Sequence, residues 1–149
     1  LISSGKIHQA NEGCACTMNS ILKQFIKHLT VGENEVVLLD MEAGVEHFGR
    51  GVDNSVDLIL MVVDPSFESL KLTKKIQQLG ESIGKPVFFV LNKVNEQILP
   101  TMLESIDDQS KVLAVISADT EIARKGLLGN ELMMEIPEIH TLARKILKQ

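Results

Sequence analysis

Several polar residues in this chain come directly after apolar runs, where their side chains could bind a ligand together. They are Asp40, Asp64, Asn92 and Lys93. In a parallel sheet the carboxyl ends of the strands meet at one edge, and ligands bind there. A strand-end carboxylate such as that of Asp40 can hold the water shell of Mg²⁺ beside a nucleotide phosphate. The amide of Asn92 offers both a hydrogen-bond donor and an acceptor to a ligand.

Each of these residues also has a simpler interpretation. Asp40 can be a loop acid that caps the next turn, and an asparagine after a strand is common turn chemistry. The same two interpretations apply to Asp64, which is followed by Pro65 and Ser66. Gly44 comes soon after Asp40, and its lack of a side chain would let a phosphate approach the backbone.

Cys14 and Cys16 are the only cysteines, and they form a second group with possible chemistry. A single intervening residue makes a disulfide between them strained. Two thiols cannot complete a tetrahedral site, but two chains that meet across a two-fold axis would supply four thiolates. Such a site suits Zn²⁺ or Ni²⁺, and soft thiolates also suit Cu(I). The alternative is that two small residues pack ahead of a helix, as free cysteines often do.

Short apolar runs alternate with segments of helical periodicity along the whole chain. We expect strands at Val36–Leu39, 58–63, Val87–Leu91 and 112–116, and helices at 21–29, 66–83, 96–106, 120–125 and 137–147. Asp119 should be an N-cap, and Pro137 should begin the last helix. This alternation predicts an α/β fold, a mostly parallel sheet flanked by helices. The 149 residues fit a single domain.

Composition excludes several classes of protein. The net charge of −5 argues against a nucleic-acid partner. No apolar stretch approaches the roughly 20 residues of a membrane-spanning helix. The first residues lack the pattern of a secretory signal, and two cysteines cannot form a disulfide scaffold, so we expect a cytoplasmic location.

The segment from Asp40 to Gly51 reads Asp-Met-Glu-Ala-Gly-Val-Glu-His-Phe-Gly-Arg-Gly, and it closely resembles the MinD/ParA-like ATPases of the CooC branch. The segment around Cys14 and Cys16 resembles the part in which CooC-type proteins carry a metal-binding pair at a subunit interface. The resemblance implies a deviant P-loop ATPase of the SIMIBI-like fold. Such a protein forms a homodimer with ATP bound and helps to insert nickel into a metalloenzyme such as carbon monoxide dehydrogenase.

The same resemblance assigns roles to the candidate residues. Asp40 would be the catalytic acid for Mg²⁺ with ATP or ADP, and the nucleotide-binding set would be Asp40, Gly44, Asp64, Asn92 and Lys93. Ser117 stands where many relatives carry a proline, so the resemblance is weaker at that position. In the family the glycine-rich phosphate loop lies ahead of the region seen here, and no glycine cluster in these 149 residues can replace it.

Two hypotheses follow from this sequence. The first is that the chain is the C-terminal part of a larger nucleotide-binding domain, a CooC/MinD-like ATPase for metallocentre maturation. On its own the chain would then not hydrolyse ATP efficiently, because the phosphate cradle supplies most of the binding and positioning. The second is that the chain is a non-enzymatic metal-binding dimerisation module, acting as a metallochaperone or docking partner.

Overall fold

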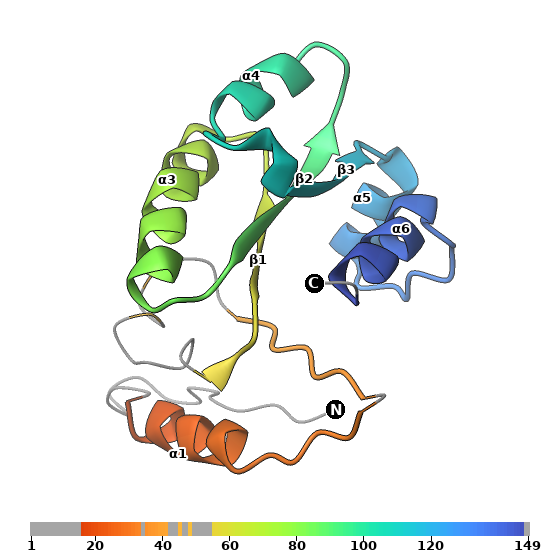
Figure 1. The fold of residues 1–149 in the computed structure, drawn as a ribbon. Helices are drawn as coiled ribbons and strands as arrows, with labels where there is room; N and C mark the ends of the chain where they lie inside the picture. The colour runs from red at the N-terminus through yellow and green to blue at the C-terminus, as the bar shows by residue number, and fades with distance from the viewer. Residues whose placement is uncertain (1–15, 34, 42–44, 46–47, 49–54, 148–149) are drawn as a thin grey trace. The chain divides into compact units, whose positions relative to one another are not determined.

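The computed structural model describes residues 16–33, 35–41, 45, 48 and 55–147. The chain divides into two compact units, Leu1–Asp57 and Leu58–Gln149, which we call unit 1 and unit 2. Unit 2 contains the sheet and most of the helices, whereas the described part of unit 1 contains the amphipathic helix α1, Cys16–Lys27 (Figure 1). The helix expected at 21–29 is therefore present, but it begins five residues earlier, at Cys16.

The strand expected at Val36–Leu39 is wrong. These residues belong to no strand, and their side chains are mostly exposed, with Leu38 at 85%. An apolar run becomes a strand only when a neighbouring strand completes its backbone hydrogen bonds. The described part of unit 1 contains no such neighbour. Asp40 therefore follows an unpaired segment and does not end a strand.

Unit 2 is built on a three-stranded parallel sheet in the order β1-β2-β3. The strands are β1, Ile59–Val63; β2, Val87–Val94; and β3, Val112–Ser117. The predicted α/β class with a parallel sheet is confirmed. All three strands are rich in β-branched and other apolar residues, as expected for strands that are covered by helices on both faces.

Helices follow each strand in unit 2. They are α3, Phe67–Ser82; α4, Leu99–Glu104; a short 3₁₀ helix η2, Gln109–Lys111; α5, Thr120–Leu128; and α6, Pro137–Ile146. The predicted caps are confirmed. Asp119 accepts hydrogen bonds from the backbone N–H groups of Glu121 and Ile122, and Pro137 begins α6.

The two faces of the sheet are covered by different helices. Figure 1 shows α3 on one side of the strands and α6 on the other, and the contacts agree: α3 packs on β1 and β2, whereas α6 packs on β3. Successive residues of a strand point to opposite faces. Val90 therefore packs with Leu113 and Leu142 beneath α6, while its neighbours Phe89 and Leu91 are fully buried on the α3 side.

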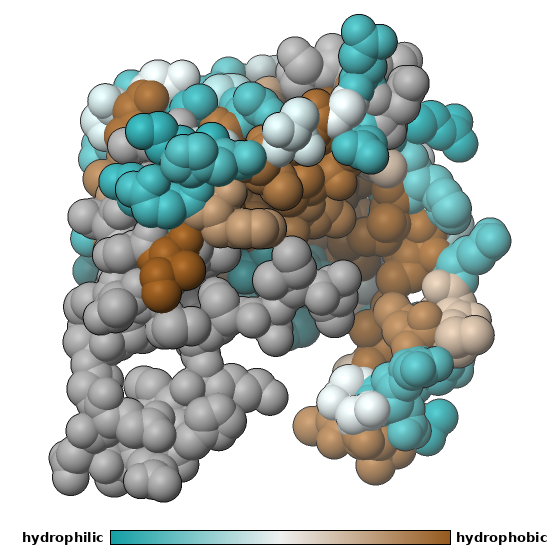
Figure 2. Space-filling view, turned by 90° about the horizontal axis from the view of Figure 1, so that it is seen from below, coloured by the Kyte–Doolittle hydropathy of each residue, from teal (hydrophilic) through white to brown (hydrophobic). Residues whose placement is uncertain are grey.

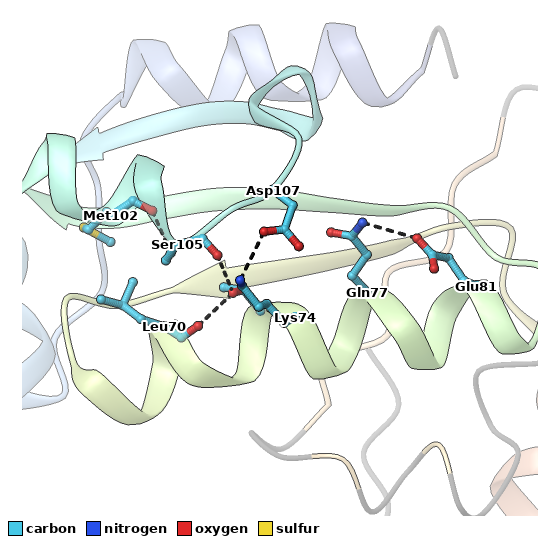
Figure 3. Close-up of polar contacts among 8 residues, drawn as sticks. Leu70, Lys74, Gln77, Glu81, Met102, Ser105 and Asp107 are labelled. Atoms are coloured by element: carbon cyan, nitrogen blue, oxygen red, sulfur yellow. Dashed lines mark hydrogen bonds and ion pairs between the residues drawn. The ribbon is translucent and has the colours of Figure 1, made fainter.

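A buried hydroxyl ties α3 to the end of α4. The Thr73 hydroxyl lies 2.7 Å from the carbonyl oxygen of Leu70 and 3.1 Å from that of Ser105, so its hydrogen is shared between them. Figure 3 shows this side of α3, where an exposed ion pair joins Lys74 to Asp107 at 3.2 Å. Thr73 is only 1% exposed, so its hydrogen bond satisfies a buried polar group and contributes more than the exposed ion pair does.

Unit 2 keeps a considerable apolar surface. Figure 2 shows brown, apolar side chains gathered across the face that is seen from below. The large apolar side chains of unit 2 that are exposed are Val62, Phe67, Leu127, Leu128, Leu132, Met133, Ile139 and Leu147. Contiguous apolar surface on a folded protein usually marks a place where something else packs.

Gly80 allows α3 to lie close to β2. A Cβ atom at this position would stand 2.3 Å from Cγ2 of Val87 and 3.0 Å from the carbonyl oxygen of Lys85. Both groups are held in place, because Val87 is a buried strand residue and the Lys85 carbonyl belongs to the backbone. The absence of a side chain at position 80 therefore sets the distance between helix and sheet.

We expect Gly80→Ala to lower the free energy of unfolding by about 1–3 kcal/mol, the usual cost of overpacking a core. Urea denaturation followed by circular dichroism measures it. The matched control is Gly126→Ala in α5, where an added Cβ meets nothing within 4 Å. That change should be neutral or stabilise by up to about 1 kcal/mol, because alanine favours helix. Equal stabilities for the two variants would contradict the close approach at Gly80.

Candidate functional site

The candidate site lies at the carboxyl edge of the sheet in unit 2. The last register pair of β1 and β2 is Val63 with Leu91. Asp64 follows Val63, and Asn92 follows Leu91, so the register brings these two polar residues opposite each other. The sequence predicted that Asp64, Asn92 and Lys93 would share one edge, and the structure brings all three together.

Asp64 is the centre of this group. Nδ2 of Asn92 donates a hydrogen bond to Oδ1 of Asp64 at 2.9 Å, and Nζ of Lys93 donates to Oδ2 of Asp64. Both carboxylate oxygens are thus engaged by side chains of β2. The side chain of Lys93 is 63% exposed and that of Asp64 is 42% exposed, so this ion pair is open to solvent and to a ligand.

The backbone of Asp64 is fixed by the start of α3. Its N–H donates to Oγ of Ser69 at 3.1 Å, and the Ser69 N–H donates to Oγ of Ser66, the N-cap of α3. The residues Asp64-Pro65-Ser66 therefore form a short, hydrogen-bonded connection between the end of β1 and the N-cap of α3. This local network fixes the backbone of Asp64 independently of the contacts that its carboxylate makes with β2.

Lys93 has an unusual backbone conformation. Its φ is +56°, a left-handed value that residues other than glycine rarely adopt. It lies where the pairing of β2 with β3 shifts register, between Leu91 and Val94. Residues with a strained backbone cluster at ligand sites, where contacts with the surrounding structure offset the cost of the strain. The conformation turns β2 at the point where its side chains meet Asp64.

The third strand adds a helix terminus to this edge. β3 ends at Ser117, and the N–H of Ala118 donates to the carbonyl oxygen of Val94 at 2.8 Å, which joins the ends of β2 and β3. The carboxylate of Asp119 is occupied by capping α5. Asp119 is therefore a structural residue, as the sequence predicted.

The other sequence-predicted residues belong to unit 1. Asp40 is exposed, whereas Gly44 and Cys14 lie outside the described residues, and Cys16 is the first residue of α1. Among the residues that the structure describes, no three His, Cys, Asp or Glu side chains are close enough together to hold a metal ion. None of the described helices is long and apolar enough to cross a membrane.

Ionisation in unit 2 is perturbed clearly at one place away from this edge. The pKa of Asp108 is lowered because the Ser110 hydroxyl and the Ser110 N–H both donate to its carboxylate. Asp108 caps η2, which precedes β3, so it lies at the amino end of that strand and serves a turn. The shift marks local structure and does not add to the candidate site.

The sequence of this chain is similar to those of several curated proteins. No family model matches the chain. It is 45% identical, over 99% of its length, to an uncharacterized ATP-binding protein of Methanocaldococcus jannaschii, and it covers 59% of that protein. That relative is named only as an ATP-binding protein.

Further relatives point the same way. A second uncharacterized ATP-binding protein of M. jannaschii is 33% identical over 91% of the chain, which covers 54% of that relative. The carbon monoxide dehydrogenase accessory protein CooC of Rhodospirillum rubrum is 32% identical over 82% of the chain, which covers 47% of CooC. The chain thus spans about half the length of the curated relatives it matches.

The strain at Lys93 can be measured apart from its charge. Lys93→Ala and Lys93→Gly both remove the ammonium group, but only glycine tolerates the left-handed backbone. We expect the glycine variant to be more stable than the alanine variant by about 1 kcal/mol, measured by urea denaturation. At an ordinary strand position the order would be reversed, because glycine weakens a strand. A more stable alanine variant would therefore contradict the strained conformation.

Proposed function

We propose that this chain is the C-terminal, base-reading part of a CooC/MinD-like ATPase that serves metallocentre maturation, with nickel insertion as the specific task. The observation that carries the proposal is the convergence of Asp64, Asn92 and Lys93 at the carboxyl edge of a parallel sheet. It is supported by similarity to two proteins named as ATP-binding and to CooC. Units 1 and 2 would belong to one nucleotide-binding domain.

Each residue has a role in this proposal. Asn92 contacts the edge of the base, and Lys93 contributes positive charge near the nucleotide. Asp40 is the catalytic acid that holds the water shell of Mg²⁺, and Gly44 lets a phosphate approach the backbone. Bound Mg²⁺ would neutralise charge on the phosphates. An exposed carboxylate at Asp40 is chemically suited to a water-mediated Mg²⁺ contact.

The 149 residues contain no glycine-rich loop to cradle phosphates. Without it the nucleotide is held through contacts to its base and ribose, so affinity should be low, with a dissociation constant of about 1 mM. Most of the affinity that the phosphates of ATP supply depends on that loop, so ATP should bind this chain only a little more tightly than adenosine does.

The nucleotide site can be tested by titrating the chain with ATP and following backbone and side-chain amide resonances by NMR. We expect the largest shifts at Asp64, Asn92 and Lys93, and we expect Asn92→Ala to weaken binding about fivefold or more, the effect of one lost hydrogen bond. The control is Asn130→Ala, which changes an exposed amide in the turn after α5. Shifts confined to other residues would overturn the proposal. So would the absence of any shift at about 10 mM ATP, roughly ten times the expected Kd.

We further propose that Cys14 and Cys16 of two chains hold Zn²⁺ or Ni²⁺ in a homodimer that docks on a nickel enzyme such as carbon monoxide dehydrogenase. The donor set supports this, since four thiolates satisfy the preference of either ion. The accessory role named for the R. rubrum relative supports the choice of partner. The exposed apolar residues of unit 2 support association with another protein surface.

The metal proposal predicts one ion per two chains, with a shift from monomer to dimer. Elemental analysis and light scattering during Zn²⁺ and Ni²⁺ titrations under reducing conditions measure both quantities. Cys14→Ser with Cys16→Ser should abolish binding, and His28→Ala, which removes an exposed potential ligand, should leave it unchanged. A double cysteine variant that keeps stoichiometric metal would rule out the thiolate site.

A further inference from the structure

The sheet of unit 2 has a free edge at β3. Among the residues that the structure describes, β3 pairs with β2 on one side and with no strand on the other (Figure 1). Successive residues of a strand direct their backbone N–H and C=O groups to alternate sides. The N–H of Ala118 donates to the carbonyl oxygen of Val94 in β2. The backbone groups of Ser117 and Val115 are therefore directed to the free side.

A cleft of about 330 Å³ lies between this edge and α6, and we call it the β3–α6 cleft. One wall is formed by Leu113 to Val115, and the other by Glu138, Thr141 and Lys145, which share one face of α6. Nζ of Lys145 donates to the carbonyl oxygen of Leu113. No described side chain makes a comparable bond to the backbone of Val115. The cleft thus exposes a strand edge that is only partly satisfied.

The two charged side chains of the cleft have no opposite charge to pair with. Neither Glu138 nor Lys145 forms an ion pair with any other residue in the described part of the chain. They are separated by two helical turns, about 10 Å along the axis of α6, which is too far for them to pair with each other. The cleft is therefore basic at one end, beside Leu113, and acidic at the other.

We propose that the β3–α6 cleft binds a second copy of this chain, with two β3 edges paired about a two-fold axis. Identical strands related in this way run antiparallel. With the axis at Val115, that residue exchanges both backbone hydrogen bonds with the partner's Val115. Leu113 then pairs with the partner's Ser117, whose N–H replaces the Lys145 ammonium at the Leu113 carbonyl.

The same axis brings the charges of α6 together. Thr141 lies near the midpoint between Glu138 and Lys145, and it lines the cleft together with Val115. An axis at that level places each Lys145 beside the partner's Glu138, so the lysine that leaves the Leu113 carbonyl gains an ion pair. A lysine on an edge strand discourages pairing with other strands. The edge therefore favours a partner that supplies a carboxylate at this distance.

Self-association can be measured by sedimentation equilibrium at up to about 1 mM chain. The chain carries Cys14→Ser and Cys16→Ser, and the buffer contains EDTA, so that no thiolate metal site contributes. Because the contact is small, we expect a weak dimer with a Kd of about 0.1 mM. Hydrogen exchange should show growing protection of the Val115 and Ser117 amides as the concentration rises. A chain that stays monomeric throughout would overturn the proposal.

Charge reversal tests the contact between the two α6 helices. Lys145→Glu and Glu138→Lys should each weaken the dimer about tenfold or more, because like charges then meet across the axis. An equal mixture of the two variants restores opposite charges at both contacts and should form a heterodimer. The control is Lys74→Glu, which makes the same change in net charge on α3 and should leave the Kd unchanged. A mixture that stays monomeric would contradict the paired charges.

Two further variants separate this contact from a purely protective lysine. If Lys145 served only to block the edge, Lys145→Ala would strengthen association, whereas the proposal predicts weaker association. Val115→Pro removes the N–H at the axis and should abolish the dimer, since a proline is tolerated where a strand N–H faces outward. Circular dichroism verifies folding, and if the proline variant is unfolded, the charge variants still decide. This contact needs no metal ion, so its failure would leave the proposed thiolate dimer untouched.

Discussion

The parallel pairing of β1 with β2 is the constraint on which the candidate site depends. Five consecutive residue pairs, from Ile59 with Val87 to Val63 with Leu91, set the register. The next residues along the two strands, Asp64 and Asn92, are the ones that hydrogen-bond. A slip of one residue would send every side chain of the slipped strand to the opposite face of the sheet. The packing of α3 on one face and α6 on the other therefore protects the geometry of the site as well as the core.

Much of unit 2 could be predicted from the sequence because the ends of its helices and strands are marked by residues that are close together in the chain. The cap at Asp119 and the helix start at Pro137 depend on residues within one helical turn, and both were confirmed. The end of β1 before Asp64 was also predicted, because an apolar run that stops at a polar residue is visible without any partner. The predicted end of β2 at Leu91 was wrong, since β2 continues to Val94. Strand order and register depend on pairing between distant segments, and only the structure supplies them.

Three features could not be predicted from the sequence. Val36–Leu39 has the composition of a strand, but strand formation requires a neighbour, and composition does not say whether one is present. The left-handed backbone of Lys93 runs against the preference of its own side chain, so no local signal marks it. It arises where β2 shifts its pairing with β3, a long-range cause. The orientation of the Asn92 amide likewise follows from a contact between two strands.

The absence of a side chain at Gly80 has a consequence for how this sequence can diverge. The space next to Gly80 is filled by the Val87 side chain, so the two positions share one volume between a helix and a strand. A larger residue at position 80 becomes acceptable only in a background where position 87 has already become smaller. Substitutions at these two sites should therefore arise in a fixed order during evolution, with the strand position changing first.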